Sequence, residues 1–316
     1  MPAIRVLFRL VSVALKLLVA AAVAVPAVLA MADIHPHARS ARPADPLLLH
    51  VHGLAYSADG RDLLVPNHTG LARFRDGGWS EVAGPIHDFA GFSLTERAIY
   101  ASGHPAPGSD LPNPLGLVKS IDGGASWTTL ALGGEADFHI LAAGYRSNSI
   151  YVLNVEPNSA MSRVGLHHST DDGKTWRYRA GRGVQGNGFA LAAHPIDPAT
   201  VAVVTDKGLF LSRDAGESFK RFDGRLAATA VTFELDGQKL RFARAIRRQM
   251  VSAALDSRSR TIVLLPPIGL DYVTHIAQSP TSPRTFAIAT DRRHVYVTTS
   301  NAGRTWRQIA KDGDLP

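Results

Sequence analysis

The 316-residue sequence contains no cysteine, and only 19% of its residues are charged. Disulfides and cysteine-ligated metal sites are therefore excluded, and a hydrophobic core must hold the fold. The net charge is +7, but subtracting Arg5, Arg9 and Lys16 of the N-terminal segment leaves +4. This excess is too small to indicate a nucleic-acid partner, and no basic run coincides with a nucleic-acid-binding motif. We therefore expect no nucleic-acid partner.

Long hydrophobic runs are almost absent, and the main one is the uncharged stretch of 14 residues from Leu17 to Ala30. A membrane span needs about 20 residues, so this run is typical of an export signal, with cleavage after the small residues near position 30. An uncleaved anchor is the alternative, because apolar residues continue back past Lys16. We predict a signal peptide or signal anchor over 1–32 and a proline-rich linker over 33–47. The protein is then exported, periplasmic or extracellular, and contacts the membrane only through this segment.

One short pattern recurs along the rest of the chain, Ser/Thr-x-Asp/Asn-x-Gly-x-Ser/Thr-aromatic. Its clear copies are SIDGGASW (120–127), STDDGKTW (169–176), SRDAGESF (212–219) and TSNAGRTW (299–306). A double gap before the last copy predicts a degenerate one in ALDSRSRT (254–261), and FRDGGW (74–79) is a shortened one. The aspartate positions are 42 to 49 residues apart: Asp76, Asp122, Asp171, Asp214, Asp256 and Asn301.

Six units of this length suit four short strands each, and alternating apolar residues flank every copy. The sequence therefore predicts an all-β fold over 48–316, a six-bladed β-propeller of four-stranded antiparallel blades. We expect the blades over 48–84, 85–133, 134–182, 183–223, 224–267 and 268–312. The ring could be closed by the segment before Leu48 or by the C-terminal strand.

The residues that recur in the clear copies of the pattern are expected to have structural roles. We expect the aspartate to accept backbone N–H groups of a hairpin between the third and fourth strands, and the glycine to supply positive φ. The segments resemble the Asp-box (bacterial neuraminidase, BNR) repeat, and 48–316 resembles the secreted propellers that carry it. That superfamily includes sialidases and other glycoside hydrolases, sortilin-type receptor ectodomains and photosystem assembly factors. The resemblance implies the fold, because enzymes and binding proteins both carry the box.

The arginine pattern argues against sialidase chemistry. Sialidases of this fold carry an Arg-Ile-Pro motif and three arginines that clamp a carboxylate. This sequence has no Arg-Ile-Pro, and its predicted first strands contain no arginine. An anionic sugar would lack its bidentate counter-charges. The sequence leaves open whether the protein is an enzyme of another glycosyl hydrolase type.

Histidine is plentiful, with 13 in the sequence, and several stand where first strands begin. These starts carry His50 and His52, His87 and Asp88, Asp137 and His139, and Asp271, Tyr272 and His275. First strands of a propeller converge on its axis, so their starts share one face. The turns after second strands join that face with Asn67, His68, His104 and, more weakly, Glu156.

Imidazoles with nearby carboxylates suit a divalent transition metal such as Zn²⁺ or Cu²⁺. The predicted ligands are His50, His52, His87, His104, His139 and His275. An aspartate beside a ligand histidine could orient its ring. The alternative is a polar mouth without metal, whose histidines bond water and backbone. We expect His194 in a turn and His167 and His168 away from the axis.

Three functions follow from these features. The first is an exported propeller that binds a small ligand, a glycan, a protein or a metal ion at this face. The long loop 102–117 beside this face is either a rim that selects the ligand or an ordinary connection. The second is a hydrolase, since glycosidases need two carboxylates about 5 to 10 Å apart. Its candidate catalytic residues are Asp88, Asp137, Glu156 and Asp271. The third is an assembly factor for a membrane complex.

Overall fold

The computed structural model describes residues 48–223, 228–244, 249–257, 259–298 and 305–315. The predicted signal segment 1–32, the linker 33–47 and the last box position, Asn301, lie outside these ranges. All regular structure in the described ranges is β-strand. Accordingly, this part of the chain has no helix with the length and hydropathy to span a bilayer.

Six four-stranded antiparallel sheets follow one another along the chain, each with its strands in sequence order. The first two contain β1 (Ala55–Tyr56), β2 (Leu63–Asn67), β3 (Gly70–Arg75) and β4 (Gly78–Glu81), then β5 (Asp88–Leu94), β6 (Ile99–His104), β7 (Leu117–Ser120) and β8 (Thr128–Ala131). The next two contain β9 (Leu141–Ala143), β10 (Ile150–Asn154), β11 (Gly165–Ser169) and β12 (Arg177–Arg179), then β13 (Gly188–Ala193), β14 (Val201–Thr205), β15 (Gly208–Ser212) and β16 (Lys220–Asp223). The last two contain β17 (Ala228–Phe233), β18 (Lys239–Arg244), β19 (Gln249–Ala254) and β20 (Arg260–Leu264), then β21 (Val273–Gln278), β22 (Phe286–Thr290), β23 (Val295–Thr298) and β24 (Trp306–Ala310).

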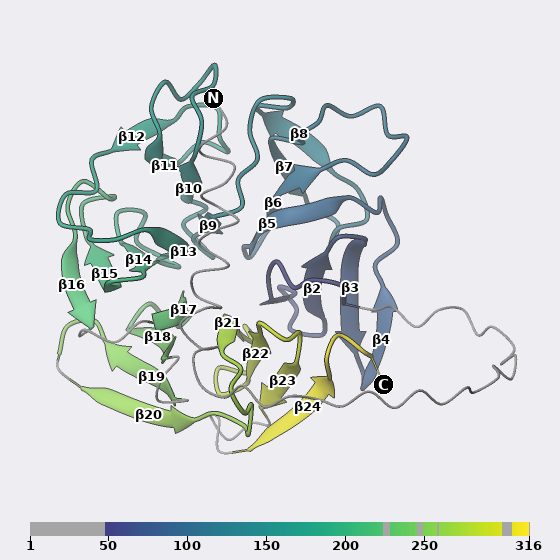
Figure 1. The fold of residues 1–316 in the computed structure, drawn as a ribbon, viewed down its shortest axis with the longest axis vertical. Helices are drawn as coiled ribbons and strands as arrows, with labels where there is room; N and C mark the ends of the chain where they lie inside the picture. The colour runs from purple at the N-terminus through teal and green to yellow at the C-terminus, as the bar shows by residue number, and fades with distance from the viewer. Residues whose placement is uncertain (1–47, 224–227, 245–248, 258, 299–304, 316) are drawn as a thin grey trace, which may run out of the picture. The chain divides into compact units, whose positions relative to one another are not determined.

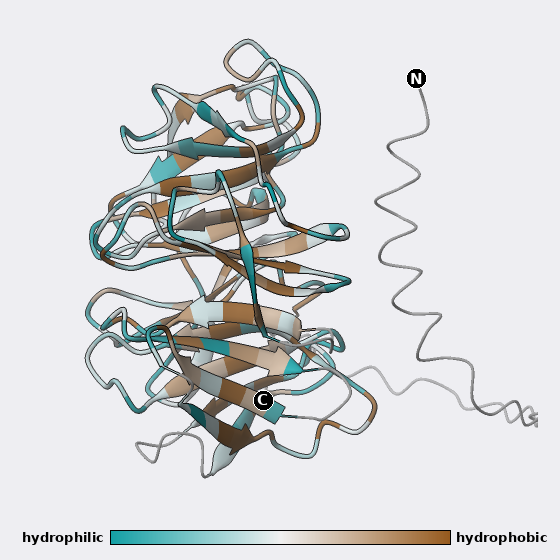
Figure 2. Cartoon of the chain, turned by 90° about the vertical axis from the view of Figure 1, so that its left-hand side faces the viewer, coloured by the Kyte–Doolittle hydropathy of each residue, from teal (hydrophilic) through white to brown (hydrophobic). Residues whose placement is uncertain are grey.

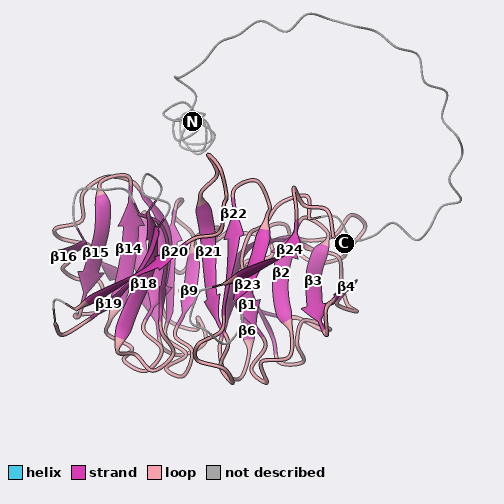
Figure 3. Ribbon diagram, turned by 90° about the horizontal axis from the view of Figure 1, so that it is seen from below, coloured by secondary structure: helices cyan, strands magenta, loops and turns pink. Residues whose placement is uncertain are grey.

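The sheets form a ring around a central axis. The first strand of each sheet contacts the first strands of the sheets before and after it, from β1 through β5, β9, β13, β17 and β21 back to β1. Figure 1 shows these strands near the centre and the fourth strands at the rim, and Figure 3 shows turns at both ends of the strands. The predicted six-bladed β-propeller is confirmed, and every sheet falls within its predicted blade boundaries.

The core lies between neighbouring blades. Second strands such as Val201–Thr205 are buried at every residue, because a blade covers each of their faces. Rim strands such as Thr128–Ala131 keep exposed residues. Hydrophobic residues accordingly gather along the strands and hydrophilic residues in the turns (Figure 2). Packing between blades therefore supplies the stability that disulfides cannot.

The ring closes where the two ends of the propeller meet. Among the described residues, the sixth sheet consists of four strands that all lie within 273–310. The Leu48 N–H donates to the Gly313 carbonyl at 2.9 Å. The Trp79 indole N–H of the first blade donates to the Ile309 carbonyl of the sixth at 2.6 Å. Hydrogen bonds between the first and last blades thus join the ends.

Three of the repeated segments form hairpins with the same hydrogen bonds. In SIDGGASW, the Asp122 carboxylate accepts the Ser126 N–H at 2.9 Å and the Ser120 hydroxyl at 2.7 Å. Ser120 Oγ in turn accepts the Gly124 N–H at 2.9 Å. Asp171 and Asp214 repeat this set. Each hairpin joins the third and fourth strands of its blade, so these aspartates shape the scaffold.

Two other predicted box positions are built differently. Asp76 and Gly77 form a two-residue turn between β3 and β4, and both have positive φ. Such a turn matches the twist of a tight hairpin and needs no longer loop. Asp256 is exposed and pairs with Arg213 Nη2 of the preceding blade at 2.9 Å. Within the described residues, neither Asp76 nor Asp256 makes the hydrogen bonds that surround Asp122 in the second blade.

Candidate metal centre

Two histidines of the candidate centre lie on the extended segment that leads into β1. The His52 N–H donates to the Pro66 carbonyl of β2 at 3.1 Å, so the segment continues the sheet beyond the strand's formal start. Residues two apart in an extended segment face the same side. His50 Nδ1 consequently lies 3.4 Å from His52 Nε2, with ring centroids 4.6 Å apart. The predicted pairing of these two imidazoles is what the structure shows.

A third imidazole comes from the turn between β2 and β3. The Asn67 side-chain oxygen accepts the Thr69 N–H at 2.6 Å, which fixes a tight turn with His68 at its tip. The His68 ring lies 5.3 Å from the His50 ring and 4.7 Å from the His52 ring, centroid to centroid. One ligand atom from each of the three histidines lies within 4.8 Å of the other two. We call His50, His52 and His68 the histidine triad.

Asp88, at the start of β5, connects the triad to the second blade. Its Oδ1 lies 2.9 Å from His68 Nδ1 and 3.8 Å from His52 Nε2. The carboxylate lies close enough to attract both rings electrostatically, although its buried Oδ1 completes no hydrogen bond among the described residues. Asp88 thus lies beside two of the candidate ligands, and its predicted role in orienting a ring stays a prediction.

A second carboxylate bridges two more histidines. The Asp137 carboxylate bonds His139 Nε2 at 2.6 Å and lies 3.3 Å from His104 Nε2. His104 Nδ1 is 2.7 Å from the Asn113 side-chain oxygen, which ties the long loop 102–117 to the mouth. The other oxygen of Asp137 is buried and bonds no group in the described ranges. This arrangement supports the rim interpretation of the loop.

The charge state of His52 follows from its surroundings. Burial lowers the pKa of His52 to about 3, and four neighbouring imidazoles add to the shift: those of His50, His68, His139 and His275. Strands from three blades therefore bring their histidines close enough to interact. His52 is neutral at neutral pH, which is the form that binds a metal.

His139 and His275 respond to different environments. The hydrogen bond to Asp137 raises the pKa of His139, against the opposing effect of burial. Burial lowers the pKa of His275 to about 4, and His50 contributes to the shift. The mouth therefore holds both neutral imidazoles and one that is readily protonated.

Several predicted site residues lie apart from the triad. His87 is buried, and its Nδ1 accepts the Ala106 N–H at 2.9 Å, so it anchors the long loop. Asp271 is buried against the Tyr272 and Arg292 N–H groups, in the last blade. Glu156 is exposed in the turn after β10. These positions therefore serve the turns around them.

His68 is the residue that the sequence places on this face but not among the metal ligands. Its place in the blade could have identified it as a candidate ligand, because the turn after a second strand lies beside the start of the first strand in the same blade. His194 occupies a turn, as expected, with Nε2 2.9 Å from the Gly237 carbonyl. His168 stacks on Tyr151 inside the third blade, with ring centroids 4.3 Å apart.

Known proteins resemble this chain in fold but not detectably in sequence. No protein-family model matches the chain, and no curated protein is detectably similar to it. The GH74 enzyme of Niastella koreensis has a similar structure, with a TM-score of 0.56 and 15% identity over 84% of this chain and 45% of that enzyme. The chain thus spans less than half of that enzyme's length.

Two further solved structures match over most of this chain. The extracellular domain of a hybrid two-component system from B. thetaiotaomicron has a TM-score of 0.50 and 9% identity, over 84% of this chain and 33% of that one. YCF48 bound to a D1 peptide has a TM-score of 0.47 and 15% identity, over 83% of this chain and 82% of that one. At identities of 15% and 9%, the matches to the GH74 enzyme and to the two-component domain concern the fold alone.

Proposed function

We propose that this protein is an exported, non-catalytic β-propeller that binds one divalent transition metal ion, Zn²⁺ or Cu²⁺, through the histidine triad. The observation that carries the proposal is the convergence of three imidazole ligand atoms within 4.8 Å of one another. Nitrogen ligands about 2.0–2.1 Å from a tetrahedral metal stand about 3.3 Å apart. The 3.4 Å between His50 Nδ1 and His52 Nε2 already matches that spacing.

The surroundings of the triad favour a metal over a bare polar mouth. His52 is neutral at neutral pH, so little proton competition opposes binding. Asp88 supplies a negative charge beside two of the three rings. Three protein ligands leave a fourth coordination position open. A donor atom of a small ligand, a glycan or a docking protein would complete the coordination.

The carboxylates at the mouth support binding more than glycoside hydrolysis. Asp88 and Asp137 each lie against two imidazoles, in positions suited to orienting rings. The other two catalytic candidates, Glu156 and Asp271, lie in turns away from the triad. Together with the missing sialidase arginines, this distribution argues for a binding role.

Isothermal titration of the metal-free protein with Zn²⁺ and with Cu²⁺ at pH 7.5 tests the proposal. We expect one equivalent to bind, and His68→Ala to weaken binding by more than about 100-fold, because it removes a direct ligand. His104→Ala is the matched control, since His104 is half-buried on the same face but outside the triad; it should retain binding. A stoichiometry well below one, or equal affinities for both variants, would refute the triad as the site.

A further inference from the structure

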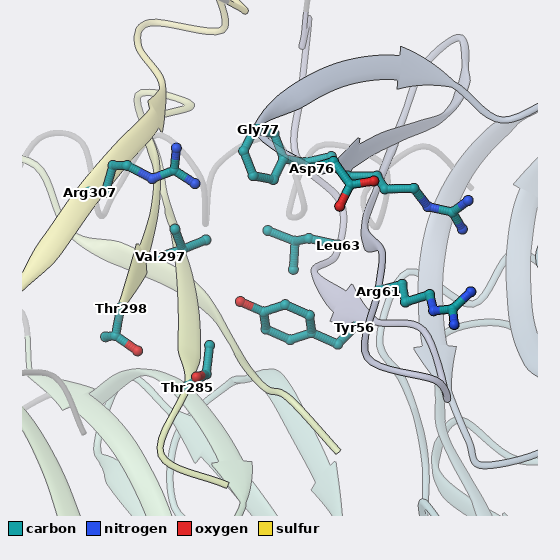
Figure 4. Close-up of a pocket in the computed structure, with 11 residues that line it drawn as sticks. Tyr56, Arg61, Leu63, Asp76, Gly77, Thr285, Val297, Thr298 and Arg307 are labelled. Atoms are coloured by element: carbon teal, nitrogen blue, oxygen red, sulfur yellow. The ribbon is translucent and has the colours of Figure 1, made fainter. Parts of the chain in front are cut away.

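The seam between the sixth and first blades contains a cavity of about 260 Å³. The first blade contributes Tyr56, Phe74 and the Asp76–Gly77 turn, and the sixth contributes Val297, Thr298 and Arg307. In Figure 4 the Tyr56 hydroxyl points across the gap toward the strand that carries Val297 and Thr298. The cavity therefore lies between blades and is separate from the histidine triad.

The short hairpin of the first blade explains why this seam is open. At three other seams, the glycine of the outer hairpin packs directly against a leucine side chain of the preceding blade. A Cβ added to Gly124 would meet Leu71 at 2.4 Å, and one added to Gly173 would meet Leu117 at 2.6 Å. At Gly77 an added Cβ would meet no atom of the described residues within 4 Å. The two-residue turn thus fails to close the space that the longer hairpins fill.

Strand direction places the cavity away from the metal centre. His68 stands at the turn between β2 and β3, where Asn67 pairs with Gly70. The cavity adjoins the opposite ends of these strands, where Leu63 pairs with Phe74. A ligand in the cavity would therefore bind independently of a metal at the triad.

Arg307 is the cation that the cavity presents to a ligand. Its guanidinium lies over the Phe74 ring, 5.5 Å from the centroid, and forms no ion pair with any described carboxylate. Arg75 is instead held by Asp62, and the Arg61 side chain points away from the Tyr56 hydroxyl (Figure 4). A planar guanidinium with no carboxylate partner suits bidentate binding of one carboxylate.

Tyr56 adds a hydrogen-bond donor to the same space. Burial raises the pKa of Tyr56 to about 12, although nearby Arg307 acts in the opposite direction. The phenol therefore stays protonated, and its hydroxyl bonds no other residue in the described part of the chain. Leu63, Phe74 and Val297 supply apolar walls. Few polar groups on apolar walls are typical of small-molecule sites.

We propose that this seam cavity is a binding site for a small monocarboxylate with a compact aromatic or apolar body. Arg307 binds the carboxylate, the Tyr56 hydroxyl donates to it, and Phe74 and Val297 enclose the body. Arg307 forms no ion pair among the described residues, and Asp76 adds a negative charge to the lining, so a singly charged carboxylate is favoured over a phosphate dianion.

The test uses 4-fluorobenzoate as the probe, with its ¹⁹F NMR line width followed as protein is added, and 4-fluorobenzamide as the neutral analogue of the same shape. We expect the benzoate to bind and the benzamide not to bind. Arg307→Gln should weaken benzoate binding about tenfold or more, while Arg61→Gln, whose side chain points away, should leave it unchanged. Tyr56→Phe should weaken it by a smaller factor.

Three other outcomes would contradict the proposed carboxylate site. Equal binding of benzamide would show that no carboxylate is recognised, and equal losses in the Arg61 and Arg307 variants would show a diffuse charge effect. Loss of benzoate binding in His68→Ala would place the probe at the metal centre instead. Arg307→Lys keeps the positive charge without the planar fork of the guanidinium and serves as a control for a folding defect. This variant should bind the benzoate more weakly than the unsubstituted protein and more tightly than Arg307→Gln.

Discussion

His68 Nδ1 lies 2.9 Å from Asp88 Oδ1, so a turn of the first blade and the inner strand of the second are joined at the mouth of the propeller. The His68 ring also lies 5.3 Å from the His50 ring and 4.7 Å from the His52 ring, centroid to centroid. Asp88 thereby lies against the one member of the triad that stands on a turn rather than on an extended segment.

Asp88→Asn should weaken Zn²⁺ binding about 10- to 100-fold without abolishing it, because outer partners of metal ligands have effects of that size. Competition with a chromogenic chelator at pH 7.5 measures the affinity. Glu156→Gln, on an exposed turn, should leave the affinity unchanged. An unaltered affinity in Asp88→Asn would separate this carboxylate from the site.

Blade contacts through the hairpins should contribute to stability. The Tyr100 hydroxyl of the second blade donates to Asp172 of the third, and Lys119 Nζ lies 2.8 Å from the same carboxylate. Removing the buried hydroxyl in Tyr100→Phe should lower the free energy of unfolding by about 1–3 kcal/mol. Urea denaturation followed by circular dichroism measures the change. Asp256→Asn, which breaks an exposed pair with Arg213, should change it by less than about 0.5 kcal/mol.

A buried ion pair at the seam between the fifth and sixth blades should be more sensitive. Arg241, only 5% exposed, lies 2.6 Å from Glu234 Oε1, and its guanidinium is 3.8 Å from the Phe286 ring centroid. Glu234→Gln leaves a buried guanidinium without its counter-charge, which costs about 3–5 kcal/mol. Urea denaturation of this variant and of Arg241→Met/Glu234→Leu tests the explanation. We expect the double variant to recover most of the loss, and equal destabilisation of both would contradict it.

Acid should destabilise the scaffold through the hairpin aspartates. The Ser126 hydroxyl and N–H lower the pKa of Asp122 to about 2, and Thr175 acts in the same way on Asp171. A carboxylate whose pKa is lower in the folded state adds stability above its unfolded pKa, near 4, and loses it as the pH falls toward 2. Unfolding free energies from pH 6 to pH 2.5 should therefore fall less steeply in Asp122→Asn/Asp171→Asn. Parallel curves would show that these carboxylates titrate alike in both states.

The sequence was sufficient for the architecture because the repeat and the strand alternation specify the same six units. The pairing of the His50 and His52 rings could also be predicted, because residues two apart in an extended segment face the same side. The same alternation puts adjacent His87 and Asp88 on opposite sides, which explains why only Asp88 reaches the mouth.

Other site positions depend on local irregularity. A register shift between Val273 and His275 interrupts the alternation of β21, so the sequence does not fix where Asp271 points. The approach of His68 to the His50 and His52 rings depends on the exact turn that Asn67 makes within the first blade, and its approach to Asp88 depends on how the first and second blades pack. Distances between blades are set by packing of the whole ring, which no single segment encodes.

Crystals of the protein soaked in ZnCl₂, with anomalous diffraction collected above and below the zinc absorption edge, test the central claim most directly. We predict one anomalous peak about 2.0–2.1 Å from a ring nitrogen of each of His50, His52 and His68. A peak bound by other residues, or no peak at the mouth of the propeller, would contradict the account.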